Sequence, residues 1–292
     1  VTVEKFNNKF NVLAASSVKS FGVRQGLIVD AGLVSSAIKK CIKDNESKLG
    51  VKITSVIAIV PSNNIEISMK TGKVNANGDM INGDVIFDCI ENSLKGEKMP
   101  NMEIVNVSPI EFRIDGKKKV KNPLGLDGEV LESKNIVCFV PKKNVYSVVS
   151  VIENLNIQVT DIIISSIGDY YSIKNKELDS KVGAIVNIGE EKTVVSIFNK
   201  GIIMSESIMS IGSRLIDSEL VFNYKIDEKE AINIKNTFAV ASRRYADGEE
   251  VYEFVNKASN KVEINQYQLA ELLEANLVEM LKSIKNEIND LT

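Results

Sequence analysis

The sequence predicts an α/β protein in which a small α+β unit interrupts the first domain and a second α/β domain follows. A helix at 33–49 precedes an apolar strand at 51–61, an alternation typical of an α/β layer. Short strands and dense turns replace this pattern from 65 to 141, and a three-strand meander at 182–208 opens the second domain. The length of 292 residues agrees, because one domain usually has about 100–200 residues.

The composition excludes several classes of function. Histidine is absent, which removes the usual general base near pH 7, every Ser-His or Cys-His dyad, and a common neutral metal ligand. A net charge of −3 and an aromatic content of 6% argue against nucleic-acid binding. Cys41, Cys89 and Cys138 lie far apart, as lone core cysteines of a cytoplasmic protein do. We therefore predict no catalytic residue and no metal-ligand cluster.

The apolar stretches of the chain are short. Each falls below the about 18 residues that a membrane-spanning helix needs, so we expect buried strands instead. We expect no signal peptide. The chain begins without methionine inside a predicted strand and stops inside a predicted helix, and we expect both ends to be cuts.

The first domain is predicted from its turn and helix signals. Strands at 1–4 and 10–15 flank the polar turn Asn7-Asn8-Lys9. In the helix at 33–49, apolar residues recur at spacings of three and four, and Gly50 is a C-cap signal. We expect the strand at 51–61 to be buried. After the inserted unit, a helix at 145–155 and a strand at 159–165 resume the α/β layer.

The inserted unit has one predicted helix, at 79–91, and an alternating strand at 104–114. It also has a basic run of four lysines, Lys117, Lys118, Lys119 and Lys121. We interpret this run as a solvated hairpin tip. The alternative is a contact with an acidic neighbouring subunit or with anionic lipid.

The second domain begins with strands at 182–187, 193–198 and 201–208, and helices follow at 214–222 and 228–238. The polar segment 245–262 is predicted as strand-like, with a turn at Asp247-Gly248. A last helix from Gln266 has an apolar stripe, which favours a core helix over a membrane-surface helix because its polar face is mixed in charge. The stripe consists of Leu269, Leu272, Leu273, Leu277, Leu281, Ile284 and Ile288.

Three stretches resemble a known family. Residues 22–30 are similar to its Gly-Ile-x-x-Gly-x-Ile-Val-Asp segment, and 107–112 to its Pro-x-x-Phe strand. The most specific stretch is 120–128, Val-Lys-Asn-Pro-Leu-Gly-Leu-Asp-Gly, followed by Leu131-Glu132. The family has a very similar Lys-(Asp/Asn)-Pro-x-Gly-x-x-Gly stretch in an inserted subdomain. In order and distance, these stretches resemble the bacterial cell-division FtsA family over nearly the whole chain.

The resemblance implies an actin-like (ribonuclease-H-like) fold of two lobes, with the insert on the first lobe. Members bind ATP with Mg²⁺ between the lobes, polymerise into filaments, tether FtsZ to the membrane and recruit later division proteins. The membrane helix would lie beyond Thr292, and the protein would be cytoplasmic and peripheral at the inner face of the membrane at the division site. The implied parts are the first lobe (1–65, 143–181), the insert (66–142), the second lobe (182–222, 263–292) and its small subdomain (223–262).

The second phosphate hairpin of the family reads Asp-x-Gly-Gly-Gly-Thr-Thr, and residues 187–193 stand in its place. Gly189 and Thr193 match it, whereas Asn187 replaces the acidic residue. Glu190 and Glu191 replace two glycines, which adds side chains and negative charge where backbone should approach phosphate. One such contact, at ~4 Å and an effective dielectric of ~20, opposes phosphate binding by roughly 4 kcal/mol.

The adenosine side departs from the family in the same direction. Lys235 matches the family's Glu-x-x-Lys, but Ile232 stands in place of the Glu, and Gly212-Ser213 replaces a Gly-Gly pair. We therefore expect weak or no ATP hydrolysis and weak binding of ATP and Mg²⁺ at most. The first hypothesis is an adaptor and filament protein whose subunits meet through the insert and the lobes.

Three alternatives stay open. The main one is an active actin-like ATPase whose filaments depend on nucleotide. A pilus-type actin-like adaptor is disfavoured by Pro123-Leu124-Gly125, which matches the division family more closely. Sugar and acetate kinases share the core fold but need an intact phosphate loop. Arg243 and Arg244, in the subdomain that contacts FtsZ in the family, are candidates to bind the acidic FtsZ tail.

Overall fold

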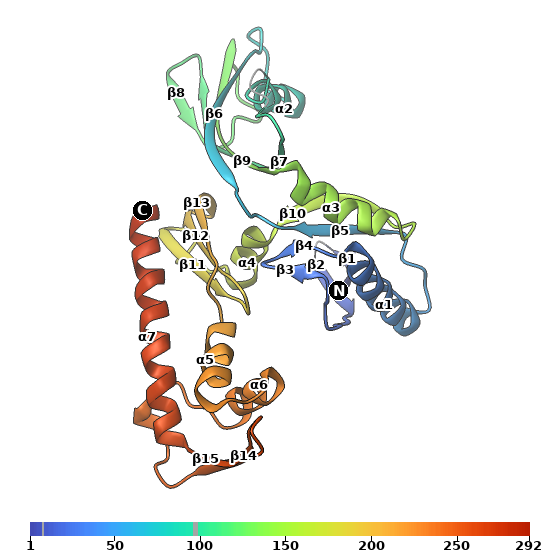
Figure 1. Cartoon of the computed structure of the whole chain (residues 1–292). Coiled ribbons are helices and arrows are strands. Elements are labelled where there is room, and N and C mark those ends of the chain that lie inside the picture. The colour runs from blue at the N-terminus through green and yellow to red at the C-terminus, as the bar shows by residue number, and fades with distance from the viewer. Residues whose placement is uncertain (8, 96–98) are drawn as a thin grey trace. The chain divides into compact units, whose positions relative to one another are not determined.

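The computed structural model describes residues 1–7, 9–95 and 99–292, and these form two compact units (Figure 1). The first unit contains residues 1–183 and 198–204, and the second contains 184–197 and 205–292. Asn8, in the predicted first turn, lies outside the described residues. None of the described helices is long and apolar enough to cross a membrane.

The part of the first unit outside the insert contains three pairs of strands and three helices. In the one parallel pair among the described strands, β5 and β10 lie side by side with Val60 opposite Ile164. The strands are β1 (Thr2–Phe6) with β2 (Lys9–Ala14), β3 (Val23–Arg24) with β4 (Leu27–Ile28), and β5 (Ser55–Val60) with β10 (Gln158–Ile164). The helices are α1 (Ala31–Leu49), α3 (Lys142–Glu153) and α4 (Ser165–Ile173).

Helix α1 has the ends that its sequence predicts. The side chain of Asp30 accepts a hydrogen bond from the backbone N–H of Leu33, so the helix begins two residues before the predicted start. At the other end, Gly50 has a left-handed φ of 68° and donates its N–H to the carbonyl of Glu46. The predicted glycine C-cap is confirmed.

The strand β5 is half exposed, so the prediction of a buried strand is wrong. Ala58 packs with α1 and α3 in one apolar cluster. Ile57 and Ile59, which point to the opposite face, are 65% and 63% exposed. The reason is the two-residue period of a strand: among the described residues, helices cover only one face of this pair.

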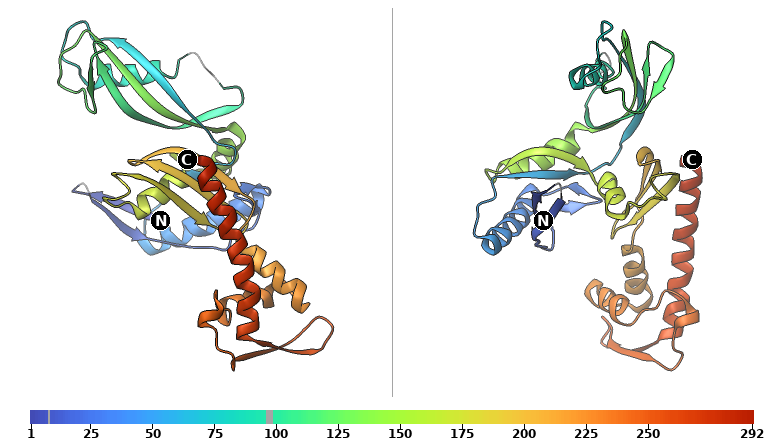
Figure 2. Two further views of the ribbon diagram at one scale, coloured as in Figure 1. Left: turned by 90° about the vertical axis from the view of Figure 1, so that its left-hand side faces the viewer. Right: turned by 180° about the vertical axis from the view of Figure 1, so that it is seen from behind.

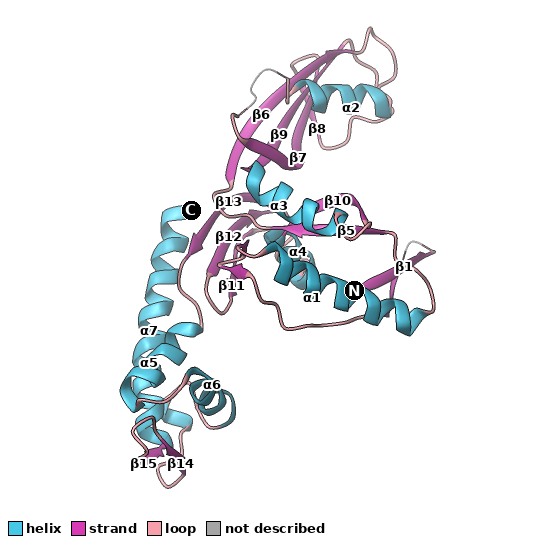
Figure 3. Ribbon diagram, turned by 45° about the vertical axis from the view of Figure 1, so that its right-hand side comes forward, coloured by secondary structure: helices cyan, strands magenta, loops and turns pink. Residues whose placement is uncertain are grey.

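The insert is a four-stranded antiparallel sheet with α2 on one face (Figure 3). Its core consists of Ala76, Ile81, Cys89, Phe112, Ile114 and Leu131. Helix α2 begins at Gly83 and not at 79, because the Asn82 side chain caps the N–H of Val85. In spatial order the strands are β6 (Glu66–Asn75), β9 (Val130–Pro141), β7 (Met102–Ile114) and β8 (Lys118–Val120), and α2 spans Gly83–Asn92.

Helix α4 packs against the tip of a hairpin within the first unit, and the sequence did not predict it. The ring of Tyr170 stacks on Phe198, with centroids 4.7 Å apart, and its hydroxyl donates to the carboxylate of Asp179. Burial and this carboxylate raise the pKa of Tyr170 to about 12. Lys174 lies over the same ring.

The meander predicted at 182–208 is present as a three-stranded sheet in the order β11-β12-β13. The long helix α7 runs along this sheet (Figures 1 and 2), with Met280 and Ile284 packed against Val195. Met280 is buried and Leu281 is 55% exposed, so the predicted place of Leu281 on the core stripe is wrong. The elements are β11 (Val182–Ile188), β12 (Thr193–Asn199), β13 (Ile202–Met209) and α7 (Gln266–Leu291).

A second cluster of the second unit joins α5 (Arg214–Tyr224), α6 (Glu228–Thr237), β14 (Val251–Val255) and β15 (Lys261–Asn265) to the start of α7. Its centre is made by Leu220, Ile234 and Leu269, all fully buried. The strand-like segment predicted at 245–262 is a hairpin with its turn at 256–260. The predicted turn at Asp247-Gly248 instead precedes β14.

Candidate functional site

The turn between β11 and β12 brings together most of the predicted nucleotide-site residues. Gly189 donates its N–H to the carbonyl of Lys192 at 2.9 Å, which closes the turn. Asn187 lies exposed near the end of β11. Thr193 is fully buried at the start of β12, and its hydroxyl donates to the carbonyl of Ile211 at 2.7 Å.

The turn packs directly on the start of α5. The N–H of Ser213 donates to the carbonyl of Gly189 at 2.9 Å, and that of Arg214 to the carbonyl of Glu190 at 2.8 Å. A Cβ at Gly212 would lie 2.5 Å and 2.6 Å from the same two carbonyl oxygens. Glycine at 212 is therefore required for the close approach of helix and turn.

Arg214 holds both acidic side chains of the turn. Its Nη2 lies 2.7 Å from Oε1 of Glu190, and its Nη1 lies 2.7 Å from Oε1 of Glu191. Hydrogen bonding to Glu190 and the nearby negative charges raise the pKa of the guanidinium further. Sequence reasoning missed Arg214. The available signal was its place directly after Gly212-Ser213, a pair that was among the predicted nucleotide-site residues.

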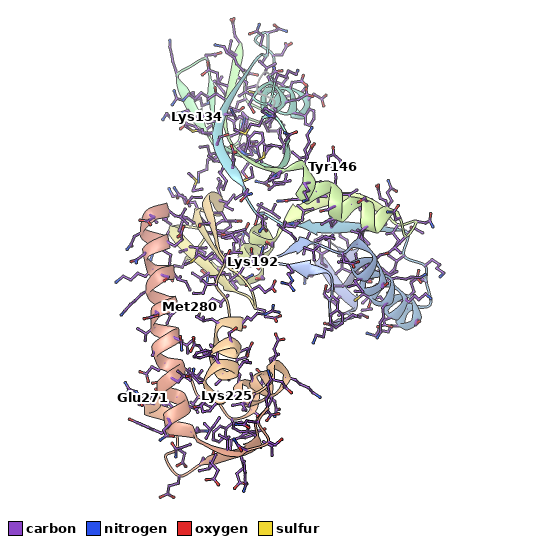
Figure 4. The ribbon with its side chains drawn as sticks, in the orientation of Figure 1. Lys134, Tyr146, Lys192, Lys225, Glu271 and Met280 are labelled. Carbon is purple, nitrogen blue, oxygen red and sulfur yellow. The ribbon has the colours of Figure 1, made fainter. Side chains whose placement is uncertain are left out.

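Lys192 is partly buried beside the same turn (Figure 4). Burial lowers the pKa of its ammonium group, and the charge of Glu206 acts in the opposite direction. Glu206 accepts a hydrogen bond from the hydroxyl of Ser196 at 3.2 Å.

Lys235, the predicted nucleoside contact, forms an ion pair with a residue of α5. Its Nζ lies 2.7 Å from the carboxylate of Asp217, whose side chain is only 3% exposed. Ile232 lies one turn earlier on the same helix and is partly buried. Asp217 is three residues after Arg214, so α5 supplies the partner for Lys235 and for the acidic turn.

Arg243 and Arg244 differ in their surroundings. Arg243 pairs with Glu271 at 3.0 Å and Glu274 at 3.3 Å, both on α7. Its N–H and guanidinium hold the pKa of the Glu274 carboxyl below its usual value. Arg244 is exposed and lies over the ring of Tyr245 at 5.8 Å.

The described residues do not fit a nucleotide's phosphates in this arrangement. The Ser213 and Arg214 N–H groups, which could face an anion at a helix start, are bonded to the turn itself. The guanidinium is shared by two carboxylates. Within the described residues no group of three or more Cys, Asp or Glu side chains could hold a metal ion.

Comparison with known proteins finds similarity for the insert and along the whole chain. A family model described as the SHS2 domain inserted in FtsA matches residues 62–138. The cell division protein FtsA of Streptococcus pneumoniae serotype 2 (strain D39 / NCTC 7466) is 26% identical over 99% of this chain and 64% of its own length. FtsA of Bacillus subtilis (strain 168) is 22% identical over 99% of this chain and 66% of its own length. The chain thus spans about two thirds of these relatives.

A solved structure is similar in fold. A chain of the PilM-PilN type IV pilus biogenesis complex aligns with 98% of this chain and 72% of its own length, with a TM-score of 0.58 and 11% identity. At this identity the similarity concerns the fold alone, and it confirms the predicted actin-like fold. The predicted boundaries of the four parts and the roles of the site residues stay predictions.

Proposed function

We propose that this chain, an FtsA-like protein by its SHS2 domain and its similarity along its whole length, links FtsZ filaments to the membrane in cell division. It does so as an adaptor that hydrolyses ATP weakly or not at all. Similarity to proteins named cell division protein FtsA supports the cell-division role. Tethering, filament formation and recruitment of later division proteins through the insert come from the family resemblance.

One observation carries the proposal of weak nucleotide use. At the turn where the family has glycines, Glu190 and Glu191 are paired with Arg214, each at 2.7 Å. A bound triphosphate would have to compete with two carboxylates for one guanidinium. Lys235 is likewise engaged by Asp217. Arg214 and Lys235, two positively charged groups that could attract a nucleotide, are therefore paired with carboxylates within the protein.

The FtsZ contact is assigned to the small subdomain, 223–262. Arg244 is the stronger candidate of the predicted pair, because it is exposed and Arg243 is tied to α7 by two carboxylates. An exposed cation next to Tyr245 suits an acidic peptide with an apolar residue. The membrane contact and the location at the inner face of the membrane rest on the family resemblance and on no described residue.

Calorimetry of Mg-ATP binding to the full-length protein tests the nucleotide part. We expect no detectable binding up to about 1 mM nucleotide, and a dissociation constant of about 1 μM or less would contradict it. That outcome would favour the alternative, an ATPase whose filaments depend on nucleotide, to which the retained Gly189 and Thr193 would then contribute.

The FtsZ contact is tested separately with a peptide of the FtsZ tail. We expect the charge reversal R244E to weaken binding about tenfold or more. The matched control is K229E, which reverses an exposed charge on α6 of the same subdomain. Equal binding by R244E and K229E would remove Arg244 from the contact.

A further inference from the structure

The turn between β11 and β12 is closed by the protein's own ionic groups. We infer that Arg214, Glu190 and Glu191 form an internal clasp, an intramolecular substitute for a bound polyphosphate that excludes phosphate until it opens. The inference rests on the proposed function in one respect, since the family resemblance places the phosphates at this turn. The clasp itself is carried by contacts within the second unit.

The geometry of the clasp matches the way arginine holds phosphate. The guanidinium uses two different nitrogens, Nη1 and Nη2, each 2.7 Å from a carboxylate oxygen. Hydrogen bonds between charged groups, such as these two, are shorter and stronger than those between neutral groups. One cation bridges two anions from adjacent residues, as it would bridge two oxygens of a polyphosphate.

The backbone N–H groups beneath the clasp are also hydrogen-bonded within the protein. The carbonyls of Gly189 and Glu190 accept the N–H groups of Ser213 and Arg214. At the start of a helix these N–H groups attract anions, and here the turn satisfies them. Gly212 permits this contact, because a side chain there would collide with both carbonyls. Side-chain and backbone donors are therefore occupied together.

The clasp is accessible, so its side-chain contacts can be removed by changing charge alone. The side chains of Arg214 and Glu190 are 41% and 60% exposed. Substituting both glutamates by glutamine keeps their size but removes the two negative charges, which leaves the guanidinium to bind an external anion. The ligand class is a polyphosphate with Mg²⁺. The Lys235–Asp217 pair on the adenosine side is not needed for it.

The probe is inorganic tripolyphosphate with Mg²⁺, titrated into the full chain by calorimetry. We expect E190Q/E191Q to bind it at least about tenfold more tightly than the unchanged protein. Adding R214A to the double variant should abolish the gain. The matched control E249Q/E250Q neutralises another adjacent glutamate pair, near the start of β14, and should leave binding as in the unchanged protein.

A second measurement covers the case in which the double variant folds poorly. In R214A alone, hydrogen–deuterium exchange should increase at 189–192 and 212–215, because the turn loses its side-chain tie to α5 and only the backbone hydrogen bonds remain. Unchanged exchange there would overturn the clasp. So would a gain in tripolyphosphate binding that survives R214A or that E249Q/E250Q reproduces.

FtsZ binding, measured on the same proteins, separates this inference from the proposed function. If the unchanged protein binds FtsZ and none of the variants gains tripolyphosphate affinity, the clasp is wrong and the adaptor role stands. If the variants gain affinity but the unchanged protein does not bind FtsZ, the clasp stands and the adaptor role is wrong.

Discussion

Gly72 in the insert and Gly212 beside the β11–β12 turn both permit a close backbone approach, but they do so for different interactions. A Cβ at Gly72 would collide with the carbonyl of Cys89 and lie 2.9 Å from the N atom of Ser93, so glycine lets α2 pack against the sheet. Beneath α2 lies an apolar core. Gly212 instead brings the start of α5 to a turn held by hydrogen bonds and ion pairs.

The two regions tolerate substitutions for different reasons. Packing in the insert depends on shape, so its residues are constrained by neighbours on every side. The turn depends on charge balance, and the acidic residues that depart from the family pattern are balanced by one arginine. The backbone of the turn can therefore stay the same while its charged side chains differ from the family pattern, as long as the charges are balanced.

The largest expected effect is in the insert. G72A should destabilise the protein by about 3 kcal/mol, because the methyl group forces α2 away from β6. Chemical denaturation monitored by circular dichroism measures the change. Gly83 is the control, since a Cβ there meets nothing within 4 Å and alanine favours a helix. Equal stability of G72A and G83A would show that the insert adjusts as freely as a polar turn.

The next effect concerns the buried ion pair of the second unit. K235M should cost about 2 kcal/mol, because it leaves the buried carboxylate of Asp217 without its cation. K229M on the exposed side of α6 is the control and should change stability by less than about 0.5 kcal/mol. A small loss for K235M would mean that water replaces the lysine, and the second unit would then depend on packing as the insert does.

Tyr170 combines the two kinds of interaction, packing and polar contact, because its ring stacks on Phe198 and its hydroxyl donates to the carboxylate of Asp179. Y170F should cost about 1 kcal/mol at pH 7. The folded pKa is raised from 10.0 to about 12, so the contribution of the protonated hydroxyl is complete below pH 10 and is lost as the pH rises toward 12. The difference between the unchanged protein and Y170F should shrink over that interval.

Denaturant unfolding at several pH values measures this dependence. Y171F, which alters an exposed neighbouring ring, is the control and should show no such convergence. A difference that stays constant up to about pH 12 would mean that the Tyr170 hydroxyl has the same pKa in the folded and unfolded states, which would contradict the raised pKa.

The smallest effect is expected at Arg243. Its pairs with Glu271 and Glu274 are partly exposed, so R243A should cost only about 0.2–1 kcal/mol, and the loss should diminish with added salt. Thermal unfolding at low and high salt measures it. A larger, salt-independent loss would show that the contact of Arg243 with α7 is as rigid as the insert core.

The sequence predicted elements whose signals are local. The periodicity of α1, its glycine cap and the three-strand meander needed no knowledge of distant residues. Helix α4 was missed because its segment contains Gly168, has no side-chain cap at Ile164 and follows directly on a strand. The caps at Asp30 and Asn82 set helix starts that apolar periodicity alone does not define.

The candidate site was predictable only in part. The departures at Asn187, Glu190 and Glu191 were readable against the family pattern. Their partner Arg214 is 23 and 24 residues away, and the link depends on how α5 packs. The Asp217–Lys235 pair likewise joins two helices. Contacts of this kind depend on tertiary structure and leave no periodic trace in the chain.

The strand order of the insert also constrains the sequence of events during synthesis. The last strand, β9, lies between β6 and β7, and β6 pairs with it over ten positions from Glu66–Phe139 to Asn75–Val130. At about 5–20 residues per second, β6 leaves the ribosome several seconds before its partner exists. The sheet can close only when Pro141 has been made, and α3 begins at the next residue. During synthesis, the insert is therefore completed at the residue directly before α3 begins.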